Sequence, residues 1–106
     1  MKKAFTLVEV LIVVAILGLI AAIGIPSFIG ARQGAEENMK QVNVSAVNAA
    51  KEQWAIINNK AVGTSVDWTN IAPYIGNSVT NQDGLRVPPG TGDPITLNPV
   101  GTSATY

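Results

Sequence analysis

A long apolar segment near the N-terminus places the strongest constraint on what this chain can fold into. From Phe5 to Ile25 the sequence reads FTLVEVLIVVAILGLIAAIGI, and Glu9 is its one charged residue. About 21 helical residues at ~1.5 Å each span roughly 30 Å, the thickness of the hydrocarbon core of a bilayer. Because Lys2 and Lys3 precede the segment, we expect a cytoplasmic N-terminus with the rest of the chain across the membrane.

Three interpretations of this segment are open. It fits a single-pass membrane anchor, the usual meaning of such a stretch. It also fits a cleaved secretory signal, because the small residues Ala21, Ala22 and Gly24 follow the apolar run. In the third interpretation only a short basic leader, residues 1–4, is removed, and the apolar helix stays in the mature protein.

The carboxylate of Glu9 favours the third interpretation. A charged side chain at the centre of a membrane helix costs about 2.5–3.5 kcal/mol on insertion scales, and neither an anchor nor a signal needs one. The segment itself holds no cation, but cleavage before Phe5 creates an α-amino group four residues from Glu9. In a stack of staggered helices, the amine of one copy would meet Glu9 of the next and fix their register.

This N-terminus resembles the methylation motif of type IV prepilins and type II secretion pseudopilins. The resemblance covers about the first 30 residues. The matching residues are Lys2, Lys3, Ala4, Phe5, Thr6, Leu7, Val8 and Glu9, followed by the apolar run to Pro26. The family mostly carries Gly immediately before the cleaved bond, where this sequence has Ala4. A small side chain at that position still fits the pattern.

The resemblance implies how the chain is processed and where it works. A prepilin peptidase would cut between Ala4 and Phe5 and N-methylate Phe5, and Glu9 would pair with the N-terminus of a neighbouring subunit. An assembly ATPase and a platform protein are the further implied partners. The precursor would lie in the inner (cytoplasmic) membrane with a cytoplasmic N-terminus, and the product would be a periplasmic or extracellular filament.

Gly18, Gly24 and Pro26 interrupt the apolar helix with residues that weaken it. Gly costs about 1 kcal/mol and Pro about 3 kcal/mol relative to Ala inside a helix. Close packing between helices is an alternative reason for the glycines, because Gly18 and Ala22 form a small-xxx-small pair. We expect a bent but continuous helix in the isolated subunit, and the family resemblance implies local melting between Gly18 and Pro26 in a polymer.

Helical periodicity continues from Ser27 to about Lys60. One apolar stripe reads as an ordinary core face; its members are Phe28, Ala31, Ala35, Met39, Val42, Ala46, Ala49 and Ile56. The other side carries Arg32, Glu36 and Lys40 at first, and then Val47, Ala50 and Trp54. The wider apolar arc after Lys40 predicts that the distal half of the helix supports a head while the proximal half meets other subunits. We expect Asn58, Asn59 and Gly63 to end the helix.

Residues 61–106 are rich in turn-forming residues and are expected to form a small C-terminal head packed on the helix. About 45 residues rarely make a stable core alone, so Trp54 and Trp68 are predicted to anchor the head. Asp67 is the expected N-cap of a short helix that ends before Gly76. The segments 95–98 and 102–106 read as two strands of a small antiparallel sheet.

The predicted fold class is therefore α+β and pilin-like: one long helix over residues 5–60 and a head with a short helix and a short antiparallel sheet. The predicted organisation is a leader (1–4), a transmembrane or filament-core helix (5–26), an amphipathic helix (27–60) and the head (61–106).

Composition argues against several classes of function. The chain has no cysteine and no histidine, so disulfides, transition-metal sites and the usual catalytic bases are not expected. Seven basic and seven acidic residues give a net charge of zero, which predicts no nucleic-acid partner. We expect no enzyme activity, no catalytic residue, no metal and no cofactor. Calcium binding at Asp83 and Asp93 is the weaker alternative to their capping turns.

Three functions remain open. The first is a structural pilin subunit that forms a homopolymer through its apolar helix in a type IV pilus-like filament. The second is a major pseudopilin of a type II secretion system, which the sequence does not separate from the first. The third is a single-pass membrane-anchored binding domain, which would keep its N-terminus and tolerate Glu9→Ala.

Overall fold

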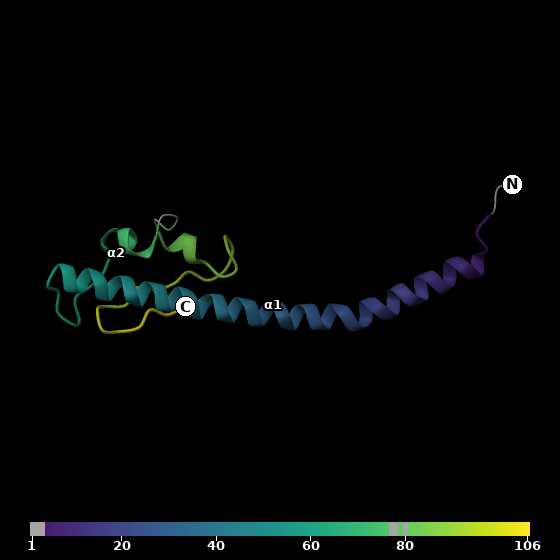
Figure 1. The fold of residues 1–106 in the computed structure, drawn as a ribbon, viewed down its shortest axis with the longest axis horizontal. Coiled ribbons are helices and arrows are strands. Elements are labelled where there is room, and N and C mark those ends of the chain that lie inside the picture. The colour runs from purple at the N-terminus through teal and green to yellow at the C-terminus, as the bar shows by residue number, and fades with distance from the viewer. Residues whose placement is uncertain (1–3, 77–78, 80) are drawn as a thin grey trace. The chain divides into compact units, whose positions relative to one another are not determined.

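A computed structural model describes residues 4–76, 79 and 81–106 of the chain. Three helical elements follow one another: α1 (Leu7–Ile57), α2 (Trp68–Ile75) and the 3-10 helix η1 (Gln82–Leu85) (Figure 1). The chain divides into two compact units, Met1–Gly34 and Ala35–Tyr106, which are described separately below. The predicted leader falls largely outside the described residues, because Lys2 and Lys3 precede Ala4.

The prediction of one long N-terminal helix is confirmed. α1 is an unbroken α-helix of 51 residues that includes Pro26. It begins at Leu7 and ends at Ile57, within three residues of the predicted limits. α1 is therefore continuous although Pro26 lacks an amide donor and glycines lie on both sides of it, at Gly24 and Gly30.

Asn59 ends α1 through its left-handed backbone conformation. Its φ angle is 52°, a region that Asn tolerates better than most residues. Lys60 N donates to Ala55 O at 2.8 Å, and Asn59 N donates to Ile56 O at 3.5 Å. This is the Schellman pattern, in which two amides beyond the helix satisfy carbonyls of its last turn. Gly63, predicted as a further stop, lies in the loop after this cap.

The core of the second unit lies between α1 and the C-terminal head. From α1 it takes Val47, Ala50, Trp54 and Ala55. The head contributes Val66, Ile71, Leu85, Ile95, Val100 and Ala104. Figure 1 shows α2 beside the last turns of α1, with the C-terminal segment returning along the same part of the helix. The head therefore obtains its core from α1, as its small size predicted.

The predicted core stripe of α1 is wrong, because the head packs on the opposite face. Phe28 is 70% exposed, Val42 66% and Ile56 77%. The face that packs against the head also carries the polar side chains of Asn43, Asn48 and Lys51, which bond to the head. An irregular head has many main-chain groups that need partners, and a stripe of Ala, Val, Met and Phe offers none.

The short helix α2 forms where it was predicted. Asp67 is its N-cap residue, and its amide donates to Asn70 Oδ1 at 3.0 Å. Ile71 is 0% exposed, and Trp68 and Ile75 pack partly buried against the core. Gly76 follows the helix with a φ of 125°, a conformation that L side chains rarely adopt.

The predicted antiparallel sheet is not confirmed. Among the described residues the structure has two isolated antiparallel bridges, Val87–Asp93 and Thr96–Thr105. Extending the second bridge would pair Asn98 with Ser103, but side chains already donate hydrogen bonds to the main-chain carbonyls of both residues. Asn98 O accepts from Lys51 Nζ, and Ser103 O accepts from the Asn98 side chain at 2.6 Å. The hairpin therefore stops after one bridge because side-chain donors satisfy the carbonyls that a ladder would use.

Candidate functional site

Within the first unit, the described part of α1 is an apolar helix whose large side chains are exposed. In the described residues, one helix is long and apolar enough to cross a membrane, and its most apolar 18-residue window has a mean hydropathy of 2.9 with none of it buried. Phe5 is 86% exposed. Exposed apolar area on this scale marks contact with a membrane or with other protein chains.

Thr6 and Glu9 form a capping box at the start of α1. Thr6 N donates to Glu9 Oε2 at 3.0 Å, and Glu9 N donates to Thr6 Oγ1 at 3.2 Å. Two amides that a helix start leaves without partners are satisfied in this way. Glu9 therefore has a polar partner in its own chain, which the sequence analysis missed. The signal was present, because residues 6–9 read Thr-x-x-Glu.

The capping box leaves Glu9 able to meet a cation. An ionised carboxylate has about four acceptor positions, and the bond to Thr6 N uses one of them. Phe5, Glu9, Val10, Val13 and Val14 together line a shallow groove on the helix. An ammonium group entering that groove would meet a carboxylate beside apolar side chains.

The predicted processing site lies just before the helix. Ala4 and Phe5 precede Leu7, the first residue of α1. A helical hydrogen bond from Val10 N to Thr6 O at 3.3 Å extends the pattern back to Thr6. The Ala4–Phe5 peptide bond is therefore outside the hydrogen-bonded helix, in the kind of exposed segment that proteases cut most readily.

The other predicted residues of the apolar segment, Gly18, Gly24 and Pro26, all lie within α1. A Cβ atom added to Gly18 or Gly24 would meet nothing within 4 Å. No contact within the described chain therefore requires a glycine at these two positions. Glycine at these two positions therefore serves either the flexibility of the backbone or contacts with other molecules.

The two predicted head anchors lie on different elements. Trp54, 8% exposed, is on the face of α1 that meets the head. The ammonium of Lys60 lies 6.0 Å from its ring centroid, within the range of a cation–π interaction. Trp68 is the first residue of α2 and packs partly buried against the same core.

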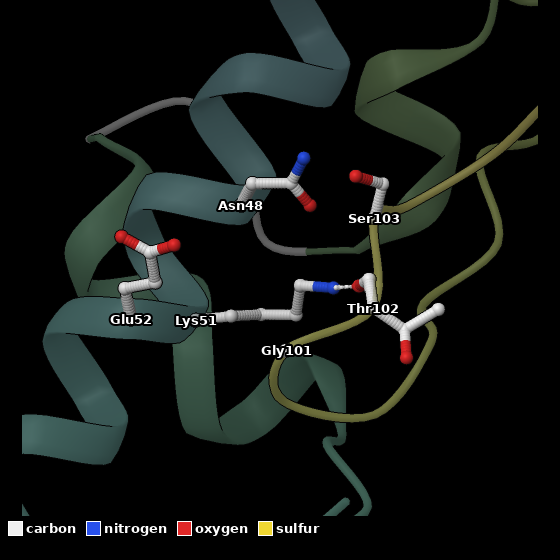
Figure 2. Close-up of a pocket in the computed structure, with 6 residues that line it drawn as sticks. All are labelled: Asn48, Lys51, Glu52, Gly101, Thr102 and Ser103. Atoms are coloured by element: carbon white, nitrogen blue, oxygen red, sulfur yellow. Dashed lines mark hydrogen bonds between the residues drawn. The ribbon is translucent and has the colours of Figure 1, made fainter. Parts of the chain in front are cut away.

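Lys51 is the residue of α1 at the head interface that the sequence analysis missed most completely. It lies on the core face of α1 and is 2% exposed. Its Nζ donates to Asn98 O at 3.1 Å. It also donates to Thr102 O at 2.5 Å (Figure 2). Burial lowers the pKa of Lys51 below its usual 10.5, and the charge of Glu52 opposes that shift.

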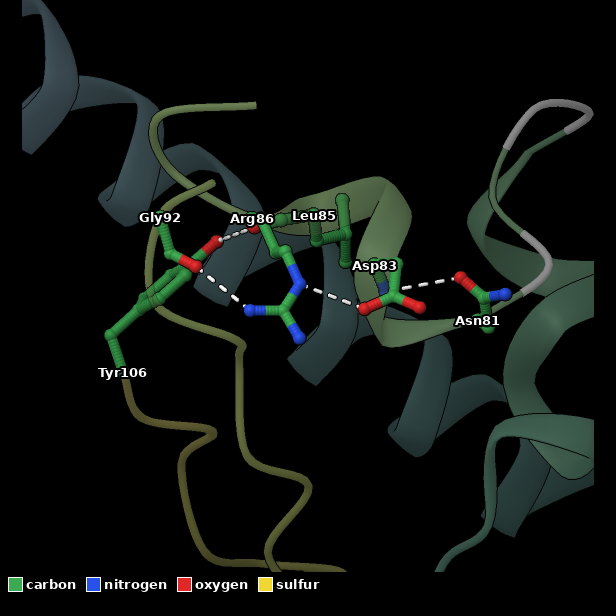
Figure 3. A network of polar contacts seen from close by, with 6 residues as sticks. All are labelled: Asn81, Asp83, Leu85, Arg86, Gly92 and Tyr106. Atoms are coloured by element: carbon green, nitrogen blue, oxygen red, sulfur yellow. Dashed lines mark hydrogen bonds and ion pairs between the residues drawn. The ribbon is translucent and has the colours of Figure 1, made fainter. Parts of the chain in front are cut away.

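Two asparagines on the same side of α1 extend this anchoring. Asn48 Oδ1 accepts from Ala104 N at 2.9 Å. Asn43 Nδ2 donates to the hydroxyl of Tyr106 at 2.7 Å. That hydroxyl donates to Leu85 O at 2.5 Å (Figure 3). The C-terminal segment is thus held to α1 by side-chain hydrogen bonds along much of its length. The signal in the sequence was polar residues within an arc otherwise held by Val47, Ala50 and Trp54.

Asp83, one of the two residues considered for calcium, is part of a different network. Arg86 Nε lies 2.8 Å from Asp83 Oδ1, and Arg86 also donates to Gly92 O at 2.9 Å. Asp83 N donates to Asn81 Oδ1 at 3.0 Å (Figure 3). Within the described part of the chain, no group of three or more His, Cys, Asp or Glu residues could hold a metal ion. Arg86 thus links Asp83 in η1 to Gly92 in the loop that follows η1.

Comparisons with known proteins agree with the N-terminal pattern. Residues 1–25 match the family model of the prokaryotic N-terminal methylation motif. The chain is 38% identical over 53 residues to the type IV major pilin protein PilA of Myxococcus xanthus (strain DK1622), a match that covers 50% of this chain and 24% of the relative. It is 30% identical over 94 residues to the type IV major fimbrial protein FimA of Dichelobacter nodosus, covering 87% of this chain and 59% of the relative.

The chain carries the prokaryotic N-terminal methylation motif, and this match and the two type IV pilin relatives support the predicted resemblance to type IV prepilins. The chain spans about a quarter of the first relative and about three fifths of the second. No solved structure matches it significantly.

Proposed function

We propose that this chain is the precursor of a pilin, a structural subunit that polymerises through its N-terminal helix into a type IV pilus-like filament. The carrying observation is the apolar first part of α1, which has no cover in its own chain and holds a carboxylate at Glu9. The match to the methylation motif and the similarity to two type IV major pilins support the same function.

In this proposal the first part of α1 exists in two environments. In the precursor it spans the inner membrane, with Lys2 and Lys3 on the cytoplasmic side. In the filament the same side chains pack against copies of themselves, so that apolar area covered by lipid becomes covered by protein. Lipid tails and protein side chains are similarly apolar, and association must therefore come from close packing and polar pairing.

Processing would create the polar group that makes the pairing possible. Hydrolysis of the Ala4–Phe5 bond leaves a carboxylate on Ala4 and an ammonium on Phe5, which is then N-methylated. The ammonium of one copy would bind Glu9 in the groove of the next copy, while Thr6 N continues to donate to the same carboxylate. A buried pair of this kind is best attested as a device that sets register.

The exposed stripe of α1 extends the surface available for packing beyond the apolar first part. Val42 and Ile56 are largely exposed although they belong to the second unit, and the small side chains of Ala46 and Ala49 share their face. Small residues allow helices to approach closely. We propose that neighbouring copies cover this stripe in the filament.

The implied machinery follows from these steps. A prepilin peptidase would process the precursor, an assembly ATPase would supply the work of extraction, and a platform protein would couple that work to the subunit. The role of the chain itself would be structural and not enzymatic.

Two measurements test the proposal. Mass spectrometry of the protein purified from its own cells is expected to show a chain that begins at N-methylated Phe5. An intact Met1 would leave the membrane-anchored binding domain as the explanation. Deleting the gene is expected to remove surface filaments and twitching. Loss of protein secretion with filaments and twitching intact would instead favour a type II secretion pseudopilin, an alternative that neither relative supports.

A further inference from the structure

Lys51 is the charged side chain that the structure buries most deeply among the residues it describes. Both hydrogen bonds shown for its Nζ go to main-chain carbonyls, those of Asn98 and Thr102. A buried ammonium usually needs an acidic partner, but the side chain of Glu52 is exposed. The main chain of the C-terminal segment therefore provides the direct contacts for this charge.

The two carbonyls belong to the ends of one turn. Thr102 N donates to Pro99 O at 3.0 Å, and Gly101 between them has a φ of 87°. Asn98 Nδ2 fixes the far side of the turn by donating to Ser103 O at 2.6 Å. Folded in this way, the turn directs the oxygens of Asn98 and Thr102 towards one point, where Nζ lies.

Such a point suits a cation. Convergent carbonyl oxygens concentrate negative potential, and a protein uses them to replace the hydration shell of an ion. A primary ammonium has three N–H donors and no acceptor, so it can serve both oxygens and still bond to water or another oxygen. Asn48, Glu52, Gly101, Thr102 and Ser103 line a cavity of about 90 Å³ beside it (Figure 2).

We propose that the turn 98–102 is a cation-binding turn whose resident cation is the tethered ammonium of Lys51, and that the pocket accepts a free small primary alkylammonium ion when that side chain is cut back. The ammonium is then a structural ligand of the C-terminal segment. The ammonium joins α1 to both ends of the turn, as a bound ion or a covalent cross-link joins segments in other proteins. This chain has no cysteine for a disulfide. The site is independent of filament formation.

The occupant is a primary alkylammonium for a geometric reason. Lys51→Ala removes three methylene groups and the ammonium, leaving the channel that they filled, which ends at the carbonyls of Asn98 and Thr102. Ethylammonium matches both parts, because its carbon chain fits the channel and its N–H groups meet the oxygens. Tetramethylammonium has the same charge but no donor, and it therefore separates binding at the carbonyls from a general effect of salt.

The test uses the full chain in detergent micelles and follows amide hydrogen exchange. The reporter is the amide of Ala104, which donates to Asn48 Oδ1 one residue beyond the cavity-lining Ser103. In Lys51→Ala we expect Ala104 to exchange at least about tenfold faster than in the natural chain. Ethylammonium chloride should restore protection with a saturable dose dependence, whereas tetramethylammonium chloride at the same ionic strength should not.

Two further variants keep the test decisive. Lys51→Met keeps a side chain of similar shape without its charge. The amide of Ala104 should therefore lose protection from exchange while the amide of Ile71 in the core stays protected. Ethylammonium should not restore protection, because the methionine side chain fills the channel. Gln53→Ala, at an exposed position of α1 in the same unit, should leave exchange at Ala104 unchanged. Native protection of Ala104 in Lys51→Met, or equal restoration of Lys51→Ala by both salts, would overturn the proposal.

Discussion

Thr6 and Glu9 bond to each other's main-chain amides at the first turn of α1, with distances of 3.2 and 3.0 Å. The carboxylate of Glu9 therefore has a role within its own chain in addition to the proposed pairing with another copy. These two roles need different chemistry. A cap needs an acceptor oxygen, whereas pairing with an ammonium needs a negative charge. Gln supplies the first without the second, and Ala supplies neither.

Glu9→Gln is expected to keep the start of α1 and to lose filament assembly. Glu9→Ala is expected to lose assembly and also to fray the first turn, because Thr6 N loses its acceptor; replacing a capping side chain by Ala costs about 0.5–2 kcal/mol. Amide exchange at Thr6 in micelles reports the cap, and the sheared surface fraction reports filaments. Normal filaments from Glu9→Gln would show that charge pairing is not what joins the copies.

Val42 and Val47 lie on opposite faces of α1, so the same substitution should lower stability at Val47 and hardly change it at Val42. Val47 is 0% exposed in the core, so Val47→Ala should lower the free energy of unfolding by about 2 kcal/mol. Val42→Ala should change it by less than about 0.5 kcal/mol. Thermal unfolding of the purified chain measures both.

The same position tests the exposed stripe. Val42→Lys should leave the isolated chain folded and reduce filament yield, because a neighbouring copy would have to bury an ammonium. The matched control is Gln41→Lys, the adjacent exposed position on α1. Equal filament yields from the two variants would contradict coverage of the stripe in the filament.

The stability contributed by Lys51 should depend on pH in a definite direction. Burial lowers the pKa of Lys51 in the folded chain, and the unfolded chain keeps a pKa near 10.5. Between these two values the unfolded chain binds more protons, so the free energy of unfolding should rise with pH. The stability of the natural chain relative to Lys51→Met should therefore increase as pH is raised towards 10.5.

Chemical denaturation of both chains at several pH values measures this difference, and titrations of tyrosines and other lysines largely cancel in the comparison. A relative stability that falls over the same range would mean that Asn98 O and Thr102 O favour the ammonium more than burial disfavours it.

Tyr106→Phe should loosen the C-terminal end of the head. The hydroxyl donates to Leu85 O and accepts from Asn43 Nδ2, and its loss should lower the free energy of unfolding by about 1 kcal/mol. Asn43 Nδ2 also donates to Leu85 O at 3.3 Å, which limits the effect. Tyr74→Phe in α2 is the control for removing a hydroxyl elsewhere in the unit. A double-mutant cycle with Asn43→Ala should show that the effects of the two substitutions are not additive.

The helices were predictable because each depends on local patterns. The run from Phe5 to Ile25 is apolar on every side, and the following residues keep a helical period to Trp54. Asp67 and Gly76 are common residues at the two ends of a short helix, and α2 lies between them. Signals of this kind act over one or two turns.

The packing of the head was not predictable in the same way. Two apolar faces of α1 competed to receive it, and a count of apolar residues favours the face that is exposed. The choice depends on where Asn43, Asn48 and Lys51 meet carbonyls, an amide and a hydroxyl that lie 42 to 63 residues away in the sequence. Local periodicity holds no information about such partners.

The sequence alone therefore determined the apolar helix, its single carboxylate, the processing motif and the helix limits, because these depend on neighbours within a few residues. The wider arc with Val47, Ala50 and Trp54 already indicated a face for the head. The tertiary structure alone decided that the stripe with Val42 and Ile56 stays exposed and that the C-terminal hairpin stops at one bridge. The physical reason is that buried main-chain groups must find donors or acceptors in space, and here the side chains of a distant helix provide them.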